Sequence, residues 1–392
     1  MTVQYPSLRR SWVTIVVLAC TGILAVGQTY VVLGLVESMA HGLSTPAAAV
    51  PTATTVFGLA YAAGFLLAGP LAAKFGARRV LLLGLAGAAV ATVAAGLATT
   101  FEAELVLRGI QGAVTASFAP CALMWIAQQM PVRLRSSATT ALTASFFAST
   151  TLLPMIAHSL PDRWGWRTMF FIGGAWLLLC CLILTALLRP SLVTPGLPLN
   201  AAMATLFRVV RRPRMLLLFA ATTVVLGAYV ALFVAIERFP SPAVLDFPAG
   251  VQGLRALSLV ALVIATAVAG ALTVVPARWR AGGGFMLVCI ASGGVALAPT
   301  PLILGGAVIV FVAAIALTAP AVIECIVSTA PSEETGAAMG WYGAFTFLGG
   351  SLGPTLPAVT QGLPGNVGLI AAAAIVGSSL MLASRVSRRP SI

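Results

Sequence analysis

The residues best able to do chemistry in this sequence are a few charged side chains inside or beside long apolar runs. Arg108 stands within the run 103–128, and Gln111 follows three residues later, on the same face of a helix. A charge in an apolar interior is costly and usually has a function there. We therefore expect Arg108 and Gln111 to line a cavity and to organise proton coupling. The alternative is an arginine that snorkels to the interface beside Glu104.

Glu37 is the candidate carboxylate for proton coupling, because it directly follows the first apolar run. Coupled to Arg108, it would take up a proton at the outer mouth of a pathway. The alternative is a solvated carboxylate at a helix end. Glu104 stands at the very start of another run, so we expect it to be the more solvated of the two acids. Glu237 is followed by Arg238, which predicts a local ion pair there.

An acid near the end of a later run predicts a gating contact. Glu324 lies close to the end of the run 302–327, where the negative end of a helix dipole opposes a carboxylate. A cationic partner is therefore expected, and Arg278 and Arg280 would lie on the same side of the membrane. We expect one of them to pair with Glu324 in a gate. The alternative is a carboxylate that reaches interfacial water.

Other polar and aromatic side chains in the apolar runs are candidates for lining a substrate cavity. They are Gln28, Thr29, Tyr30, Tyr229, Trp341 and Tyr342. Any one of the aromatic side chains is alternatively a packing residue. Sugar sites need many hydrogen-bonding side chains, yet the only asparagines, Asn200 and Asn366, fall outside the expected spans. A mostly apolar or amphipathic small molecule therefore fits better.

The sequence lacks the patterns of an enzyme, a cofactor site or a metal site. The six cysteines stand in apolar runs without the spacing of zinc ligands, and His41 and His158 are isolated. No phosphate-binding lysine loop and no Ser/His/Asp set is present, so ATP-driven transport is not expected. The net charge of +13 is distributed between apolar runs, which argues against nucleic-acid binding.

Composition places these residues in a membrane. Of the 392 residues, 60% are hydrophobic and 8% are charged, whereas soluble domains are about 25% charged. A spanning helix needs about 20 mostly apolar residues, and we count twelve such runs. They are roughly 12–36, 49–73, 80–98, 103–128, 137–159, 168–188, 214–237, 252–275, 283–299, 302–327, 337–360 and 367–384. The first run is too long for the apolar part of a signal peptide and is expected to be a retained helix.

Basic residues set the expected orientation, with both termini in the cytoplasm. Most of them then fall on the cytoplasmic side, and the exceptions are Arg108, Arg163, Arg167, Arg238 and Arg255. The segment 189–213 is rich in proline and basic residues. Within it, residues 200–212 predict a short basic helix that lies on the anionic inner leaflet, with a disordered linker as the alternative.

The two halves of the chain repeat one another with a constant offset. Gly27 and Glu37 match Gly227 and Glu237, each 200 residues later. The same offset relates two prolines and an Ala-Arg pair to their counterparts; these are Pro131 and Pro331, Pro154 and Pro354, and Ala77-Arg78 and Ala277-Arg278. A duplicated six-helix unit is therefore expected. We predict an all-α membrane protein with twelve transmembrane helices in two pseudo-symmetric bundles, 1–188 and 214–392, joined by the linker 189–213.

Three motifs resemble those of the major facilitator superfamily. Gly69-Pro-Leu-Ala-Ala-Lys-Phe-Gly-Ala-Arg-Arg79 is similar to its G-x-L-a-D-r-x-G-r-r/k signature, Leu107-Arg-Gly-Ile-Gln-Gly112 to its R-x-x-q-G motif, and Trp164-Gly-Trp-Arg-Thr-Met-Phe170 to a frequent sequence of the family. The resemblance implies that Lys74, Arg78 and Arg79 take part in gating. Ala73 replaces the acidic residue of the signature. The antiporter pattern G-x-x-x-G-P is found at Gly349–Pro354 instead of before Pro154.

The resemblance is strongest to the twelve-helix drug:proton antiporters. It implies a secondary active transporter that works by alternating access, with proton-coupled export of hydrophobic or amphipathic small molecules. We expect a monomer in a bacterial inner membrane, with protons, lipids and a small-molecule substrate as its partners and no cofactor. One alternative is an importer or facilitator of an organic anion that Arg108 binds. Another is a membrane sensor that has lost transport.

Overall fold

The computed structural model describes residues 8–159, 164–189, 199–269, 271–331, 334–360 and 362–383. These residues form helices and connecting turns without any strand. The chain divides into two compact units, Met1–Met203 and Ala204–Ile392.

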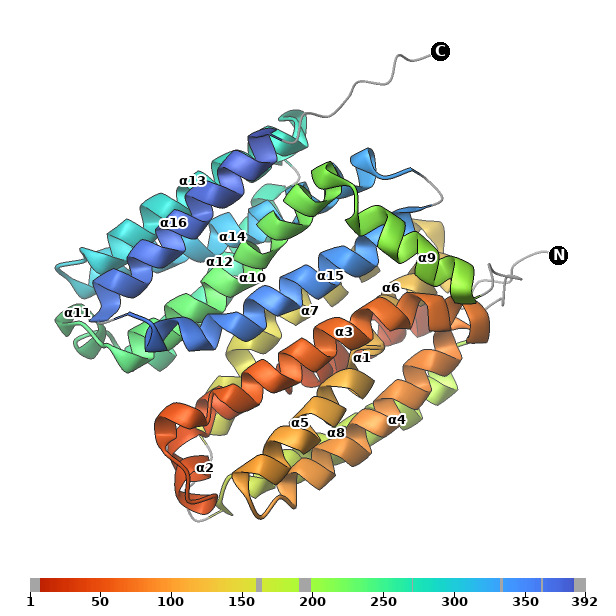
Figure 1. Cartoon of the computed structure of the whole chain (residues 1–392), viewed down its shortest axis with the longest axis horizontal. Helices are drawn as coiled ribbons and strands as arrows, with labels where there is room; N and C mark the ends of the chain where they lie inside the picture. Colours follow the sequence, from red (N-terminus) through yellow and green to blue (C-terminus); the bar gives the residue numbers. More distant parts are fainter. Residues whose placement is uncertain are drawn as a thin grey trace. The chain divides into compact units, whose positions relative to one another are not determined.

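The first unit is built of long helices that pack in pairs. Its helices are α1 (Leu8–Gly27), η1 (Val31–Gly34), α2 (Val36–Gly42), η2 (Ala47–Ala49), α3 (Thr52–Phe75), α4 (Ala77–Gly96), α5 (Phe101–Thr115), α6 (Phe118–Gln129), α7 (Val132–His158) and α8 (Arg167–Leu187). Figure 1 shows α4 beside α8 and α3 beside α5, and α1 packs on α7. Helix α9 (Leu199–Val210) follows and contains the boundary between the units.

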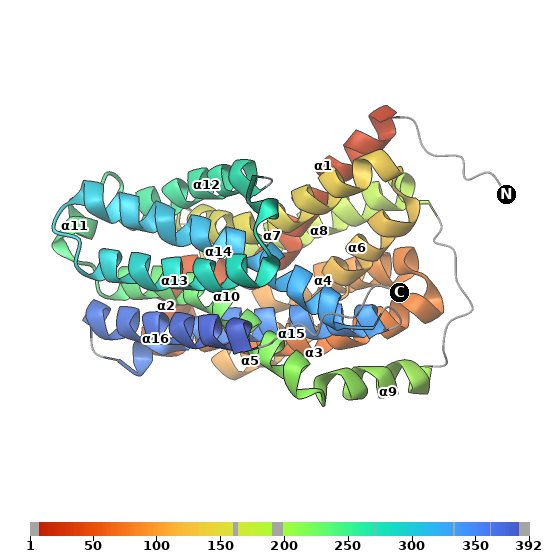
Figure 2. The same cartoon turned by 90° about the horizontal axis from the view of Figure 1, so that it is seen from above.

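The second unit has the same kind of construction. Its elements are α10 (Pro213–Arg238), α11 (Pro242–Leu245), α12 (Gly250–Ala269), η4 (Ala271–Val274), α13 (Ala277–Ala296), α14 (Pro301–Thr329), α15 (Thr335–Leu352), η6 (Gly353–Ala358) and α16 (Gly362–Ala383). Figure 2 shows α13 between α14 and α16, and α10 packs on both α15 and α16.

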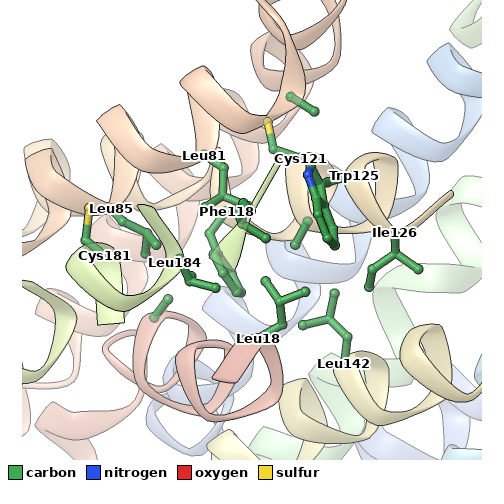
Figure 3. Packing of buried hydrophobic residues seen from close by; sticks show 14 of the residues in the cluster. Leu18, Leu81, Leu85, Phe118, Cys121, Trp125, Ile126, Leu142, Cys181 and Leu184 are labelled. Atoms are coloured by element: carbon green, nitrogen blue, oxygen red, sulfur yellow. The ribbon is translucent and has the colours of Figure 1, made fainter. Parts of the chain in front are cut away.

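The core of the first unit is a continuous apolar cluster. Figure 3 shows Phe118 of α6 among Leu18, Leu81 and Leu184, which come from α1, α4 and α8. All four side chains are at most 1% exposed. Because lipid tails are as apolar as leucine, such a cluster holds a membrane bundle together through close packing. The six cysteines are free thiols, and four of them are buried.

Small residues permit close helix crossings. A Cβ at Gly64 of α3 would lie 2.6 Å from the Ala113 carbonyl oxygen of α5. In the second unit, a Cβ at Gly349 of α15 would overlap the Thr223 carbonyl of α10, and one at Gly353 would lie 2.9 Å from the Gly227 carbonyl. These glycines therefore let backbones pack inside each unit.

Nine helical segments in the described parts of the chain are long and apolar enough to cross a membrane. Every one of the expected spans overlaps a helix of the structure. Three of them, 252–275, 283–299 and 337–360, fall on α12, α13 and α15, which are not among those nine. The last span begins earlier than predicted, so Asn366 lies within α16, where its Nδ2 donates to the Gly362 carbonyl at 2.9 Å.

Candidate functional site

The site begins where the first helix ends. The expected single helix over 12–36 is wrong, because α1 stops at Gly27 and residues 28–30 form a turn before η1. Leu153 and Pro154 of α7 pack against this segment: a Cβ at Gly27 would contact Leu153, and one at Gly34 would overlap the Pro154 carbonyl oxygen. The turn removes two carbonyls from the helical hydrogen-bond ladder, so they can accept bonds from elsewhere.

Arg108 of α5 supplies those bonds. Its Nη2 donates to the carbonyl oxygens of Gln28 at 2.7 Å and Thr29 at 3.2 Å, and its Nη1 donates to Gln111 Oε1 at 2.7 Å. The side chain is 0% exposed. Arg108 and Gln111 therefore share one face of α5, as predicted. The guanidinium donates hydrogen bonds to the backbone carbonyls that the break after α1 leaves without helical partners.

Gln111 extends the contact into a network. Its Nε2 donates to Thr92 Oγ1 of α4 at 2.7 Å and to Gln28 Oε1 at 3.3 Å. Thr92 Oγ1 donates in turn to the Ala88 carbonyl at 2.6 Å. The network thus joins the turn after α1 to α4 and α5 through buried polar groups. No pattern in the sequence indicated the part played by Thr92.

Aromatic rings cover the guanidinium. The Arg108 Cζ lies 4.4 Å from the ring centroid of Phe57 on α3 and 5.8 Å from that of Phe170 on α8. A cation over such a ring face is attracted by the ring quadrupole. Helix α3 can approach this closely because Gly112 leaves room, since a Cβ there would overlap the Phe57 carbonyl oxygen.

The two acids considered for coupling to Arg108 lie in the opposite environments to those expected. Glu37 is exposed and belongs to α2, not to the first helix. Glu104 is 0% exposed in the first turn of α5, and neither carboxylate oxygen has a hydrogen-bond partner among the described residues. The positive charges of Arg108 and Arg167 act on it. The reason is tertiary: α5 is buried from its first turn, whereas α2 is a short surface helix. In the sequence, Glu104 stands four residues before Arg108, and this spacing is the feature that could have indicated it as the acid close to Arg108.

The proposed substrate residues are spread over both units. Gln28 and Tyr30 are 0% exposed and lie at the break after α1, where Gln28 takes part in the network. In the second unit, the Tyr229 hydroxyl lies 3.1 Å from Ser258 Oγ. Trp341 Nε1 donates to the Leu206 carbonyl of α9 at 2.9 Å, and the neighbouring Tyr342 is half-buried.

The basic residues between α3 and α4 have different surroundings. Gly76 joins the two helices with φ +88°, a conformation that favours glycine. Arg78 Nε donates to the Leu188 carbonyl and Nη2 to the Thr185 carbonyl, both at 2.8 Å, so it caps the last turn of α8. Lys74 and Arg79 are exposed.

Ion pairs in the second unit fit one expectation and correct another. Arg280 Nη2 donates to Glu324 Oε2, which is the expected partnership, whereas Arg278 lies against Trp279. Glu237 does not pair with Arg238. Its partner is Arg255 of α12, whose Nη2 lies 2.8 Å from Glu237 Oε2 and whose side chain is 3% exposed.

A family model described as Major Facilitator Superfamily matches residues 17–354. The chain belongs to the major facilitator superfamily. The members of this family are membrane transporters and not enzymes, and this chain is a multi-pass membrane protein.

Relatives of this major facilitator protein include export and resistance proteins. It is 30% identical over 165 residues to the tetracenomycin C resistance and export protein of Streptomyces glaucescens, over 42% of this chain and 30% of the relative. It is 28% identical over 158 residues to the multidrug resistance protein MdtG of Klebsiella pneumoniae, over 40% of this chain and 38% of the relative. The matches thus span about a third of each curated relative.

Solved structures share the fold at low identity. The human organic anion transporter MFSD10 has a TM-score of 0.70 at 17% identity, with 96% of this chain and 100% of that chain covered. The peptide transporter POT in complex with sulfate has a TM-score of 0.74 at 14% identity, with 94% and 93% covered. These similarities support the major facilitator fold.

Proposed function

We propose that this chain is a proton-coupled exporter of hydrophobic or amphipathic small molecules that works by alternating access. Two of its relatives carry names of drug resistance or export. The bias of basic residues supports an orientation with both termini in the cytoplasm, and the bacterial origin of these relatives supports a bacterial cell membrane. The observation that carries the proposal is the buried network around Arg108, next to the buried Glu104 carboxylate, which makes no hydrogen bond with the described residues.

Glu104 is the proton-binding group of this proposal, in place of Glu37. A carboxylate without hydrogen-bond donors in an apolar interior is stable when neutral, and it needs a cation close by when ionised. Arg108 stands one turn further along α5 and is tied to the break after α1. A rearrangement of that break would move the guanidinium and change the charge that Glu104 can hold. Proton binding and helix movement are thereby coupled.

The apolar surroundings of the network favour apolar substrates. We assign substrate contact to Gln28 and Tyr30 at the break after α1, and to Tyr229, Trp341 and Tyr342 in the second unit. We assign gating to the basic residues between α3 and α4 and to the ion pair of the second unit with its neighbour: Lys74, Arg78, Arg79, the Arg280–Glu324 pair and Arg278. Both Nη atoms of Arg108 are already bonded to protein oxygens, so this arginine is poorly placed to bind a substrate anion.

Flux measurements in proteoliposomes test the proposal. The purified chain is reconstituted, a pH gradient is imposed, and transport is followed for apolar compounds and for organic anions. We expect gradient-driven flux of apolar compounds. Anion uptake without a gradient would establish a facilitator instead, and the absence of any flux would leave a membrane sensor.

A matched pair of amide variants identifies the carboxylate. The amide of Glu104→Gln copies the shape of the neutral acid and cannot ionise. We expect this variant to bind substrate but to lose the pH dependence of transport. Glu37→Gln should keep the wild-type pH profile, because Glu37 is exposed. A wild-type profile for Glu104→Gln would refute the assignment.

A further inference from the structure

Helix α9 has two faces of opposite character. Leu206 and Val209 are 4% and 1% exposed, so they are buried against protein. These two apolar side chains therefore do not face the leaflet, as they would in a helix that rests on the membrane by its apolar side. Phe207 is 56% exposed, the Arg208 side chain is 62% exposed, and Arg211 is exposed as well. At 3.6 residues per turn, these three lie on the side of the helix opposite Leu206 and Val209.

The buried face is fastened to α15 by polar contacts. The Trp341 indole donates to the Leu206 carbonyl. Glu334, directly before α15, is 5% exposed and pairs with Arg212 through contacts of 2.8 and 3.0 Å. Arg208 reaches the same carboxylate only at 3.6 Å. Arg212 therefore holds the helix in place, and it still neutralises Glu334 when Arg208 turns away.

The outer face lies at the end of a membrane-crossing helix. Helix α10 begins at Pro213 and is one of the segments apolar enough to span. Arg214 is exposed in its first turn, and Leu216 is 44% exposed just beyond. An exposed leucine there meets lipid tails, so Arg211 and Arg214 stand at the depth of the headgroups.

We propose that one exposed surface binds the headgroups of anionic phospholipids; it is formed by Phe207 and Arg208 of α9, Arg211 in the turn after α9, and Arg214 in the first turn of α10. The charges are complementary, and arginine forks match phosphate oxygens in geometry. Phe207 provides an apolar contact at the interface. The docked helix thus fixes the first turn of α10 to the membrane surface. This inference is independent of what the chain transports.

Competitive lipid binding to the full-length chain tests this surface. The protein is purified in a neutral detergent, mixed with equal amounts of phosphatidylglycerol and phosphatidylcholine, and analysed by native mass spectrometry. The variant changes Arg208, Arg211 and Arg214 together to Gln. Since each arginine near an anionic surface contributes about a fivefold factor, we expect the preference for phosphatidylglycerol to fall roughly a hundredfold.

Two controls make the result specific. A triple Gln variant at Arg9, Arg79 and Arg238, which are exposed elsewhere, removes the same charge and should lose less of the preference than the variant at Arg208, Arg211 and Arg214. Thermal unfolding of both triples shows that they remain folded. An equal loss of preference in both triples, or none in the α9 variant, would overturn the proposal.

Discussion

Replacement of Arg108 by Met separates a role in stability from a role in transport. Met has a similar length and no charge, so the change removes three hydrogen bonds and the contact with Phe57. In membrane proteins such hydrogen bonds contribute about 0.6 kcal/mol each and at most about 1.7 kcal/mol. The cation–π contact adds about 0.5–2 kcal/mol. The change also relieves a buried charge that costs about 2.5–3.5 kcal/mol at a helix centre.

These opposing contributions nearly cancel. We therefore expect the free energy of unfolding of Arg108→Met to lie within about 2 kcal/mol of the wild-type value, while gradient-driven transport is abolished. Thermal or denaturant unfolding in detergent and flux in proteoliposomes are measured on the same preparation. Arg9→Met, at an exposed position, should change neither quantity. A variant that still transports, or one destabilised by more than about 4 kcal/mol, would show that the guanidinium serves the fold and not the coupling.

Two further changes test the packing and the charge pair. Gly112→Ala should destabilise the chain by about 1–3 kcal/mol, because the new Cβ overlaps the Phe57 carbonyl. In the control Gly109→Ala, the new Cβ meets Val56 at an ordinary 3.5 Å, so the change should be tolerated. Unfolding midpoints of the two variants are compared. Arg280→Gln should cost less than about 1 kcal/mol, because the Glu324 side chain is 58% exposed. If the pair acts as a gate, the same variant slows flux, and the double exchange Arg280→Glu with Glu324→Arg restores it; unchanged flux in the single variant would contradict gating.

The sequence by itself determined the features that depend on neighbours along the chain. Apolar runs of about 20 residues predict helices wherever they occur, because a backbone in lipid must satisfy its own hydrogen bonds. The spacing of three residues between Arg108 and Gln111 places both on one helical face, and their hydrogen bond follows. The dipole argument for Glu324 found its cationic partner for the same reason, since the charge at a helix end is a local property.

Only the tertiary structure decided which acids are buried and where the first helix ends. The run 12–36 includes the polar residues Gln28 and Thr29, but nothing along the chain marks them as a break. The carbonyls freed after Gly27 accept hydrogen bonds from Arg108, about 80 residues away, which only the tertiary structure brings to them. Glu37 and Glu104 look alike as residues at the margins of apolar runs. Burial separates them, because it depends on the helices that pack around each one. Glu237 likewise prefers Arg255 of α12 to the adjacent Arg238, since side chains one position apart on a helix point in different directions.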